Sequence, residues 1–160
     1  MPTPPTRGYT GASGAQLHYR MLGEGPPVFL MHSSPLSSAF MLAQLQVLAD
    51  AGYRAIALDT PGYGQSDPLP TPPQSLTDYA RAFLAGIDAM GGIDTTRFAL
   101  YGTATGAQLA LALVRHAPGR ITRLVLDNCA LFTDAQVADW ESRYFPDLTP
   151  RADGSHMAMV

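Results

Sequence analysis

The sequence predicts an α/β domain whose mainly parallel sheet has helices on both faces. Short apolar runs of strand length alternate along the chain with amphipathic segments of helical period. Such alternation is typical of βαβ units, in which helices join parallel strands and cover the sheet. Of the 160 residues, 46% are hydrophobic and 14% are charged, which fits one globular domain with a substantial core.

Five segments have the length and composition of strands. Residues 16–22 alternate roughly between apolar and polar side chains, which predicts a strand with one solvated face. Residues 28–31 and 54–58 are mostly apolar and are bounded by turn residues, so they predict strands buried on both faces. Two further strands are expected over residues 98–101 and 121–126.

Three helices are expected between these strands. The segment 37–51 has an apolar stripe and is followed by Gly52, a residue typical of helix C-termini. The second helix begins behind Ser75 as its N-cap and runs to about residue 90. The third helix covers residues 104–116.

The two ends of the chain depart from this alternation. Residues 1–14 contain three prolines and three glycines and are expected to form a flexible lead-in to a core over residues 15–132. Beyond the core, Thr133 and Gln136 form a capping box for a last helix that extends to about residue 144. The residues after it have no clear period.

Composition and sequence patterns limit the classes of partner and cofactor that can be expected. The formal net charge of −3 leaves no basic patch, which argues against nucleic acid or an anionic membrane as a partner. The N-terminus lacks the apolar stretch of a signal peptide, no window of about 18 apolar residues occurs, and Cys129 is the single cysteine. These features predict a cytoplasmic protein. The four scattered histidines and the lack of a Gly-x-Gly-x-x-Gly pattern predict neither a metal nor a dinucleotide cofactor.

Three loops that follow predicted strands carry the residues that are candidates for catalysis or ligand binding. They are His32-Ser33-Ser34-Pro35, Asp59-Thr60-Pro61-Gly62-Tyr63-Gly64-Gln65-Ser66-Asp67 and Gly102-Thr103-Ala104-Thr105-Gly106. In open α/β sheets, ligands bind beyond the carboxyl ends of the strands. The three loops are therefore expected to meet at one site.

Together, these loops resemble those of the α/β-hydrolase superfamily. The first loop is similar to the His-Gly-x-Pro oxyanion loop, and the second to the Asp-x-Pro-Gly-x-Gly-x-Ser-Asp loop. The third is similar to the Gly-x-Ser-x-Gly nucleophile elbow, a sharp turn from a strand into a helix. The resemblance covers roughly residues 17–132 and implies an α/β-hydrolase fold that is incomplete at its C-terminus. Residues 133–160 would then begin a helical cap.

Two departures from the family pattern bear on function. Ala104 occupies the nucleophile position, so covalent serine catalysis is not expected. An elbow that naturally lacks serine and an engineered replacement of serine both remain open. The family's last two strands and its catalytic histidine have no counterpart up to Val160, so either the chain is a fragment or another chain supplies them. The open edge after Leu126 predicts association into a homo-oligomer.

The resemblance also assigns roles to single residues. The backbone amides of Ser34 and Thr105 would form the oxyanion hole, which can persist without a nucleophile. Asp127 stands where some members carry the catalytic acid. Ser33, Asn128 and His156 are further candidates for contact with a substrate.

Structural roles are expected for most other polar residues. His32 is expected to bond to nearby backbone, and Asp59 and Ser66 to hold their loop. His116 and His18 are placed on the surface, the latter on a strand, and Trp140 is expected to pack within the cap.

Three functions fit these observations. The first is a small-molecule hydrolase that is truncated or has lost its nucleophile. The second is a serine-free member with non-covalent chemistry, similar to the lyases and cofactor-free oxygenases of this fold. The third is a non-catalytic protein that binds a small organic molecule. All three would use the oxyanion-hole pocket.

Overall fold

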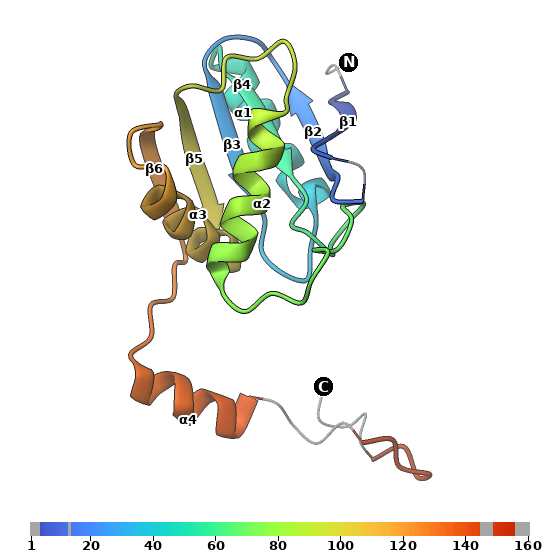
Figure 1. Ribbon diagram of the computed structural model, residues 1–160. Helices are drawn as coiled ribbons and strands as arrows, with labels where there is room; N and C mark the ends of the chain where they lie inside the picture. Colours follow the sequence, from blue (N-terminus) through green and yellow to red (C-terminus); the bar gives the residue numbers. More distant parts are fainter. Residues whose placement is uncertain (1–3, 13, 145–148, 156–160) are drawn as a thin grey trace. The chain divides into compact units, whose positions relative to one another are not determined.

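The computed structural model describes residues 4–12, 14–144 and 149–155. The chain divides into two compact units, residues 1–130 and residues 131–160. The first unit contains the sheet and three α-helices (Figure 1). Among its described residues, the second unit contains one α-helix.

The first unit is built on a twisted, mainly parallel sheet. Its strands are β1 (Thr6–Thr10), β2 (Leu17–Leu22), β3 (Pro27–Met31), β4 (Arg54–Leu58), β5 (Phe98–Thr103) and β6 (Ile121–Asp127). Their order across the sheet is β1-β2-β4-β3-β5-β6. The strands β4, β3, β5 and β6 run parallel, whereas β1 and β2 are antiparallel to their neighbours. The predicted fold class is confirmed.

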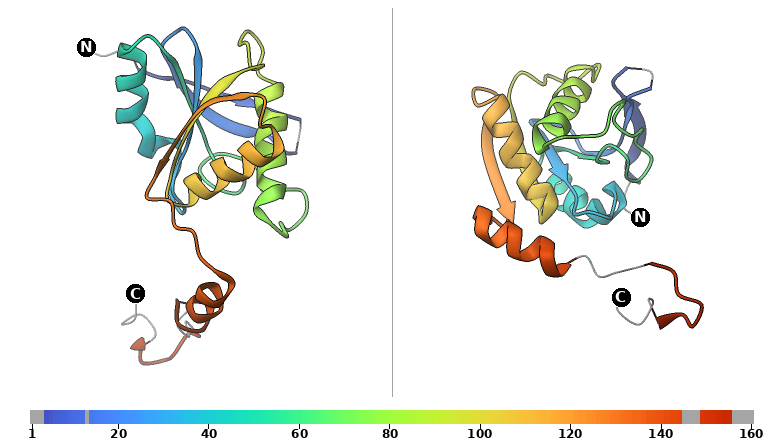
Figure 2. Two further views of the ribbon diagram at one scale, coloured as in Figure 1. Left: turned by 90° about the vertical axis from the view of Figure 1, so that its left-hand side faces the viewer. Right: turned by 60° about the horizontal axis from the view of Figure 1, so that its bottom comes forward.

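Helices cover both faces of this sheet, as expected. A short 3-10 turn, η1 (Ser38–Met41), leads into α1 (Leu42–Asp50) on one face. On the opposite face lie α2 (Leu76–Asp88) and α3 (Thr105–His116), and Figure 2 shows the sheet between the two layers. The capping box at the start of α2 is formed by Ser75 and Asp78.

The central strands supply a core on each face because successive side chains of a strand point to opposite sides. In β3, Phe29 and Met31 pack in the cluster that includes residues of α2 and α3, whereas Val28 and Leu30 pack in the cluster on the α1 face. Phe29, Leu30 and Met31 are fully buried. The expectation of a strand covered on both faces is thus confirmed, and this rigid centre positions the loops at its end.

The prediction of a flexible lead-in was wrong for residues 6–10. These residues form β1, which pairs in antiparallel register with β2, so that Thr10 lies opposite Leu17. The prolines and glycines that suggested a loose segment flank or interrupt a run of threonine and tyrosine, which favour strands. The pairing itself depends on a partner strand that follows in the chain.

The outer edge of β6 is unpaired within the described part of the chain. On its inner side β6 pairs with β5, and Val125 of β6 is 53% exposed. The predicted open sheet edge is therefore present among these residues. Association through this edge stays a prediction.

In the second unit, α4 (Asp134–Tyr144) begins with the expected capping box. The Gln136 amide donates to Thr133 Oγ1 at 3.3 Å, and the Thr133 amide donates to Gln136 Oε1 at 2.9 Å. The rings of Phe132 and Trp140 pack with centroids 5.2 Å apart. That this unit acts as a cap stays a prediction. Of the helices in the described ranges, none has the length and apolar character required to cross a membrane.

Candidate functional site

The three loops singled out from the sequence lie together at the carboxyl ends of the parallel strands. They follow β3, β4 and β5, which are neighbours in the sheet and run parallel. Met31 pairs with Leu58 on one side and with Gly102 on the other, so the strands end at the same level. The sequence prediction that these loops meet is confirmed.

The turn between β5 and α3 has the geometry of an elbow. Ala104 has φ 50° and ψ −116°, a conformation that L-residues rarely adopt and that costs free energy. Its amide donates to the Asp127 carbonyl at 2.9 Å, which ties the turn to the end of β6. The strained backbone is present although Ala104 has no nucleophilic atom to present.

Glycines on both sides of Ala104 allow this turn. A Cβ on Gly102 would collide with the backbone of Gly106, and a Cβ on Gly106 would collide with the Met31 carbonyl. The first contact lets the helix start directly behind its strand. The second lets α3 approach the end of β3, which brings its N-terminus beside the Ser34 loop.

The two residues predicted to supply the oxyanion donors are adjacent, and the amide of one of them, Ser34, already has an acceptor. The Ser34 amide donates to the Thr105 hydroxyl, with 2.6 Å between the nitrogen and Oγ1. In α3, the amides of Ala107 and Gln108 bond to the Ala104 carbonyl. The amides of Thr105 and Gly106 precede these and have no acceptor within the helix, because the first N–H groups of a helix lack one. They give this point a partial positive charge.

A cavity of about 140 Å³ lies beside these donors. Its wall is formed by Ser34, Thr60, Tyr63, Leu76, Tyr79, Thr105, Gln108 and Leu109. None of these side chains is an acid, a lysine, an arginine or a histidine. The cavity is thus a neutral, partly aromatic hollow next to a helix N-terminus. Two larger hollows of about 220 and 380 Å³ are lined by none of the predicted site residues.

Thr60 contributes an unusual group to this wall. The residue is 2% exposed, and its Oγ1 has no hydrogen-bond partner among the described residues. A buried hydroxyl without a partner is unfavourable, so such groups call for an explanation. A polar ligand atom is one group that would satisfy it.

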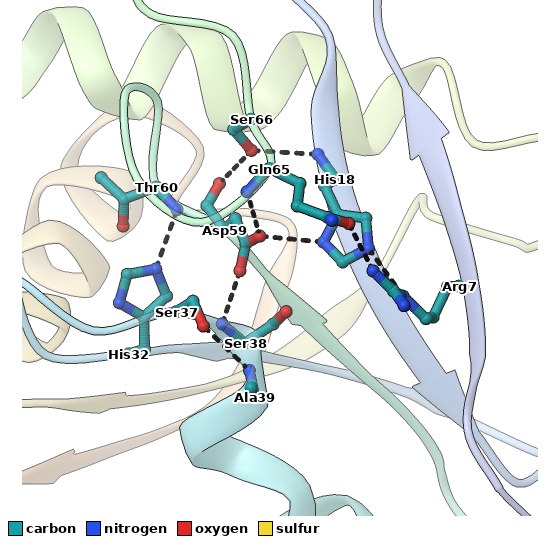
Figure 3. Close-up of polar contacts among 10 residues, drawn as sticks. All are labelled: Arg7, His18, His32, Ser37, Ser38, Ala39, Asp59, Thr60, Gln65 and Ser66. Atoms are coloured by element: carbon teal, nitrogen blue, oxygen red, sulfur yellow. Dashed lines mark hydrogen bonds and ion pairs between the residues drawn. The ribbon is translucent and has the colours of Figure 1, made fainter.

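The loop that carries Thr60 is held by a buried carboxylate (Figure 3). Asp59 Oδ1 accepts from the Ser38 amide, and Oδ2 accepts from the Gln65 amide at 2.9 Å and lies 2.8 Å from His18 Nδ1. Ser66 Oγ donates to the Asp59 carbonyl at 2.8 Å. The structural roles predicted for Asp59 and Ser66 are confirmed.

The hydrogen bonds to Asp59 determine its ionisation. Burial would raise the pKa of its carboxyl, but the donors at Ser38, Gln65 and His18 outweigh burial, and the pKa is lowered. Asp59 is therefore a fixed anion rather than a proton carrier at neutral pH.

His18 is not on the strand surface, and that prediction was wrong. It is 1% exposed, and its ring lies between Asp59 and Arg7, whose Nε is 3.5 Å from His18 Nε2. Leu17 and His18 point to opposite faces of β2, and both are buried because the loop after β4 covers the His18 side of this end of the strand. Since the covering loop follows 41 positions later, the local pattern of β2 did not indicate it.

His32 uses both ring nitrogens for backbone contacts. Its Nε2 accepts from the Thr60 amide at 3.0 Å, so the ring proton is on Nδ1, which donates to the Ser33 carbonyl at 2.9 Å. Desolvation by burial lowers its pKa, opposed but not reversed by the Ser33 carbonyl and the charge of Asp59. The neutral ring joins the first and second loops, so the predicted structural role is confirmed.

Three further candidate residues, Ser33, Asp127 and Asn128, do not line this cavity. The Asp127 carboxylate accepts from the Tyr101 hydroxyl at 2.8 Å, and Ser33 Oγ contacts the Ser34 carbonyl at 3.3 Å. Asn128 is exposed and has a positive φ of 52°. A catalytic role for Asp127 and substrate contacts by Ser33 and Asn128 stay predictions. His156 lies outside the described residues.

Several wall residues were not predicted from the sequence. Tyr79 and Leu76 come from the first turns of α2, a helix that reads as an ordinary amphipathic element. Gln108 belongs to the first turn of α3, and its side-chain amide nitrogen donates to the Ala130 carbonyl at 2.7 Å. The spacing of Gln108 from Ala104 places both at the same end of α3, which was the one available signal.

Known proteins share this arrangement of strands and loops. A family model described as alpha/beta hydrolase fold matches residues 26–159. The curated 2-hydroxy-6-oxononadienedioate/2-hydroxy-6-oxononatrienedioate hydrolase 2 of Pseudomonas putida is 36% identical over 120 residues, which cover 72% of this chain and 41% of that protein. Epoxide hydrolase 3 of Siraitia grosvenorii is 35% identical over 116 residues, covering 71% of this chain and 35% of that protein.

A solved structure gives the same result. An epoxide hydrolase from Vigna radiata has a TM-score of 0.71 and 25% sequence identity, covering 89% of this chain and 48% of that chain. The chain thus spans less than half the length of these relatives. With the strand order, the strained elbow and the family match over most of its length, this chain belongs to the α/β-hydrolase family.

Proposed function

We propose that this chain binds a small organic molecule non-covalently, with an oxygen atom of the ligand at the amides of Ser34 and Thr105. The observation that carries the proposal is the elbow at Ala104, whose strained backbone is kept without a nucleophile. What this backbone still positions is the N-terminus of α3 beside a neutral cavity. Helix N-termini favour anions and polarised oxygens.

Hydrolysis through an acyl-enzyme is not part of this proposal. The relatives named above are hydrolases, which makes hydrolysis the activity of the lineage. Ala104 has no atom that could attack a carbonyl carbon, so the covalent step is missing. The cavity and the helix N-terminus do not depend on that step.

Proton abstraction without a covalent intermediate is less favoured than binding. It requires a base with a free nitrogen or oxygen within reach of the ligand. His32 has both ring nitrogens bonded to backbone, and His18 is enclosed by Asp59 and Arg7. His116, the other histidine in the described ranges, is exposed at the far end of α3 from the cavity.

Binding can be tested by NMR titration of the chain with isobutyrate. We expect the amide signals of Ser34, Thr105 and Gly106 to shift together, with a Kd in the millimolar range or tighter, as for a small ligand of few atoms. Amides of α1, on the other face of the sheet, serve as internal controls. Signals near Ser34 and Thr105 that stay fixed at saturating isobutyrate would refute the proposal.

The absence of covalent chemistry needs a separate measurement. A fluorophosphonate probe is expected to leave the elbow unlabelled, because it reacts with activated nucleophiles. Mass spectrometry of the treated chain would detect an adduct. An adduct on any residue from 102 to 106 would show that a nucleophile exists there and would contradict non-covalent binding as the site's chemistry.

A further inference from the structure

The contact between Ser34 and Thr105 has the form of an occupied oxyanion donor. The Ser34 amide points at Thr105 Oγ1 over 2.6 Å, so the hydroxyl oxygen takes the position that an oxygen of a ligand would occupy on this amide. Both residues line the 140 Å³ cavity. A ligand oxygen that binds the Ser34 amide must therefore displace the hydroxyl.

The energetics of this exchange depend on the charge of the incoming oxygen. A neutral carbonyl replaces one neutral acceptor by another, so little is gained at the Ser34 amide. A carboxylate oxygen forms a charge-assisted bond that is roughly twice as strong as a neutral one. It also gains from the positive end of α3, where the first amides lack helical acceptors.

The rest of the cavity wall agrees with an anionic ligand of small size. Among the described residues that line it, no side chain is acidic and would repel a carboxylate. The unpartnered Thr60 hydroxyl in the same wall offers an additional donor. The volume of about 140 Å³ lies below the roughly 300–1,000 Å³ of pockets for drug-sized ligands, which points to a short-chain molecule.

We propose that the site takes short-chain carboxylates and that the Thr105 hydroxyl is an internal competitor for the Ser34 amide, which every ligand oxygen must displace. This inference rests on the proposed function, because it assumes that a ligand oxygen binds at these amides. It adds a ligand class and names the side chain that the ligand must displace.

The test compares a carboxylate with a neutral amide of the same shape. Isobutyrate and isobutyramide are titrated into the 160-residue chain and into Thr105→Val and Thr105→Ser. For the unaltered chain, we expect isobutyrate to bind about tenfold more tightly than isobutyramide. Thr105→Val removes the hydroxyl and keeps the side-chain shape, so isobutyrate and isobutyramide should each bind about five- to tenfold more tightly than before, and the ratio of their affinities should stay the same.

Thr105→Ser is the matched control because it keeps the hydroxyl and loses one methyl group. It should retain the affinity of the unaltered chain for each of the two probes. If Thr105→Val fails to fold, Thr105→Ala removes the same hydroxyl. A direct readout in the unaltered chain is the Ser34 amide proton, which should shift more with isobutyrate than with isobutyramide.

The outcomes separate the two proposals. Unchanged affinities in a folded Thr105→Val, or an equal gain in affinity in Thr105→Ser, would overturn the role of Thr105 while leaving the proposed function in place. Equal affinities of the unaltered chain for isobutyrate and isobutyramide would overturn the proposed ligand class. Failure of both probes to bind any of the variants would overturn the proposed function and the selectivity with it.

Discussion

Replacing Asp59 by asparagine tests whether one buried carboxylate holds the site together. Asparagine has the same shape but only one oxygen, so it can retain the bonds from Gln65 and His18 only by turning its NH₂ group toward the Ser38 amide. Two donors then face each other, and both lose a partner. Each unsatisfied buried group costs about 1–3 kcal/mol, so the two together should lower the free energy of unfolding by about 2–6 kcal/mol.

Urea denaturation followed by circular dichroism measures this loss. Asp94→Asn is the matched control, because Asp94 is exposed and accepts from Thr96 in a local turn that asparagine also favours. It should change the free energy of unfolding by less than about 1 kcal/mol. A loss below about 1 kcal/mol for Asp59→Asn, equal to that of the control, would refute the assignment of Asp59 as the residue that fixes this loop.

Three other predictions concern residues that lie, like Asp59, at the carboxyl ends of the parallel strands. Gly106→Ala should destabilise the chain by about 3 kcal/mol or more through its collision with the Met31 carbonyl, whereas Gly91→Ala, where a Cβ meets open space, should cost far less in a thermal melt. Ala104→Gly should raise the free energy of unfolding by about 1 kcal/mol, since glycine relieves the strain at φ 50°; a loss would contradict that strain. Because the pKa of His32 is lowered on folding, its contribution to stability is full above about pH 6.5 and is lost as the pH falls through its folded pKa. His32→Gln should abolish this decline in denaturation midpoints, while the decline below about pH 4 that follows from the lowered pKa of Asp59 should remain.

The central strands and their loops could be predicted because their signals are local. An apolar run such as residues 28–31, followed by a break in the pattern, identifies a buried strand and its end without knowledge of its neighbours. The elbow is equally local, since glycines at 102 and 106 are required by contacts within a few residues or with an adjacent strand.

The missed features depend on partners that are distant in the chain. The strand β1 exists because β2 pairs with it, and His18 is buried because the loop from Asp59 to Ser66 closes over it. The contact between Ser34 and Thr105 joins residues 71 positions apart. The motifs placed both residues at one site. They gave no indication that the Thr105 hydroxyl would accept a hydrogen bond from the Ser34 amide.

The conformation of Ala104 connects these observations to function. In a serine enzyme of this family, the strained turn presents the nucleophile, and alanine would gain nothing from that role. The turn also sets the direction in which α3 starts, and thereby brings the amides of Thr105 and Gly106 beside Ser34. A backbone at φ 50° and ψ −116° is stable at Ala104 only if the surrounding contacts outweigh its cost, and the close approach of Gly106 to Met31 is such a contact. The elbow therefore fixes the position of the N-terminus of α3. The proposed binding of a ligand oxygen requires that N-terminus and not a nucleophile.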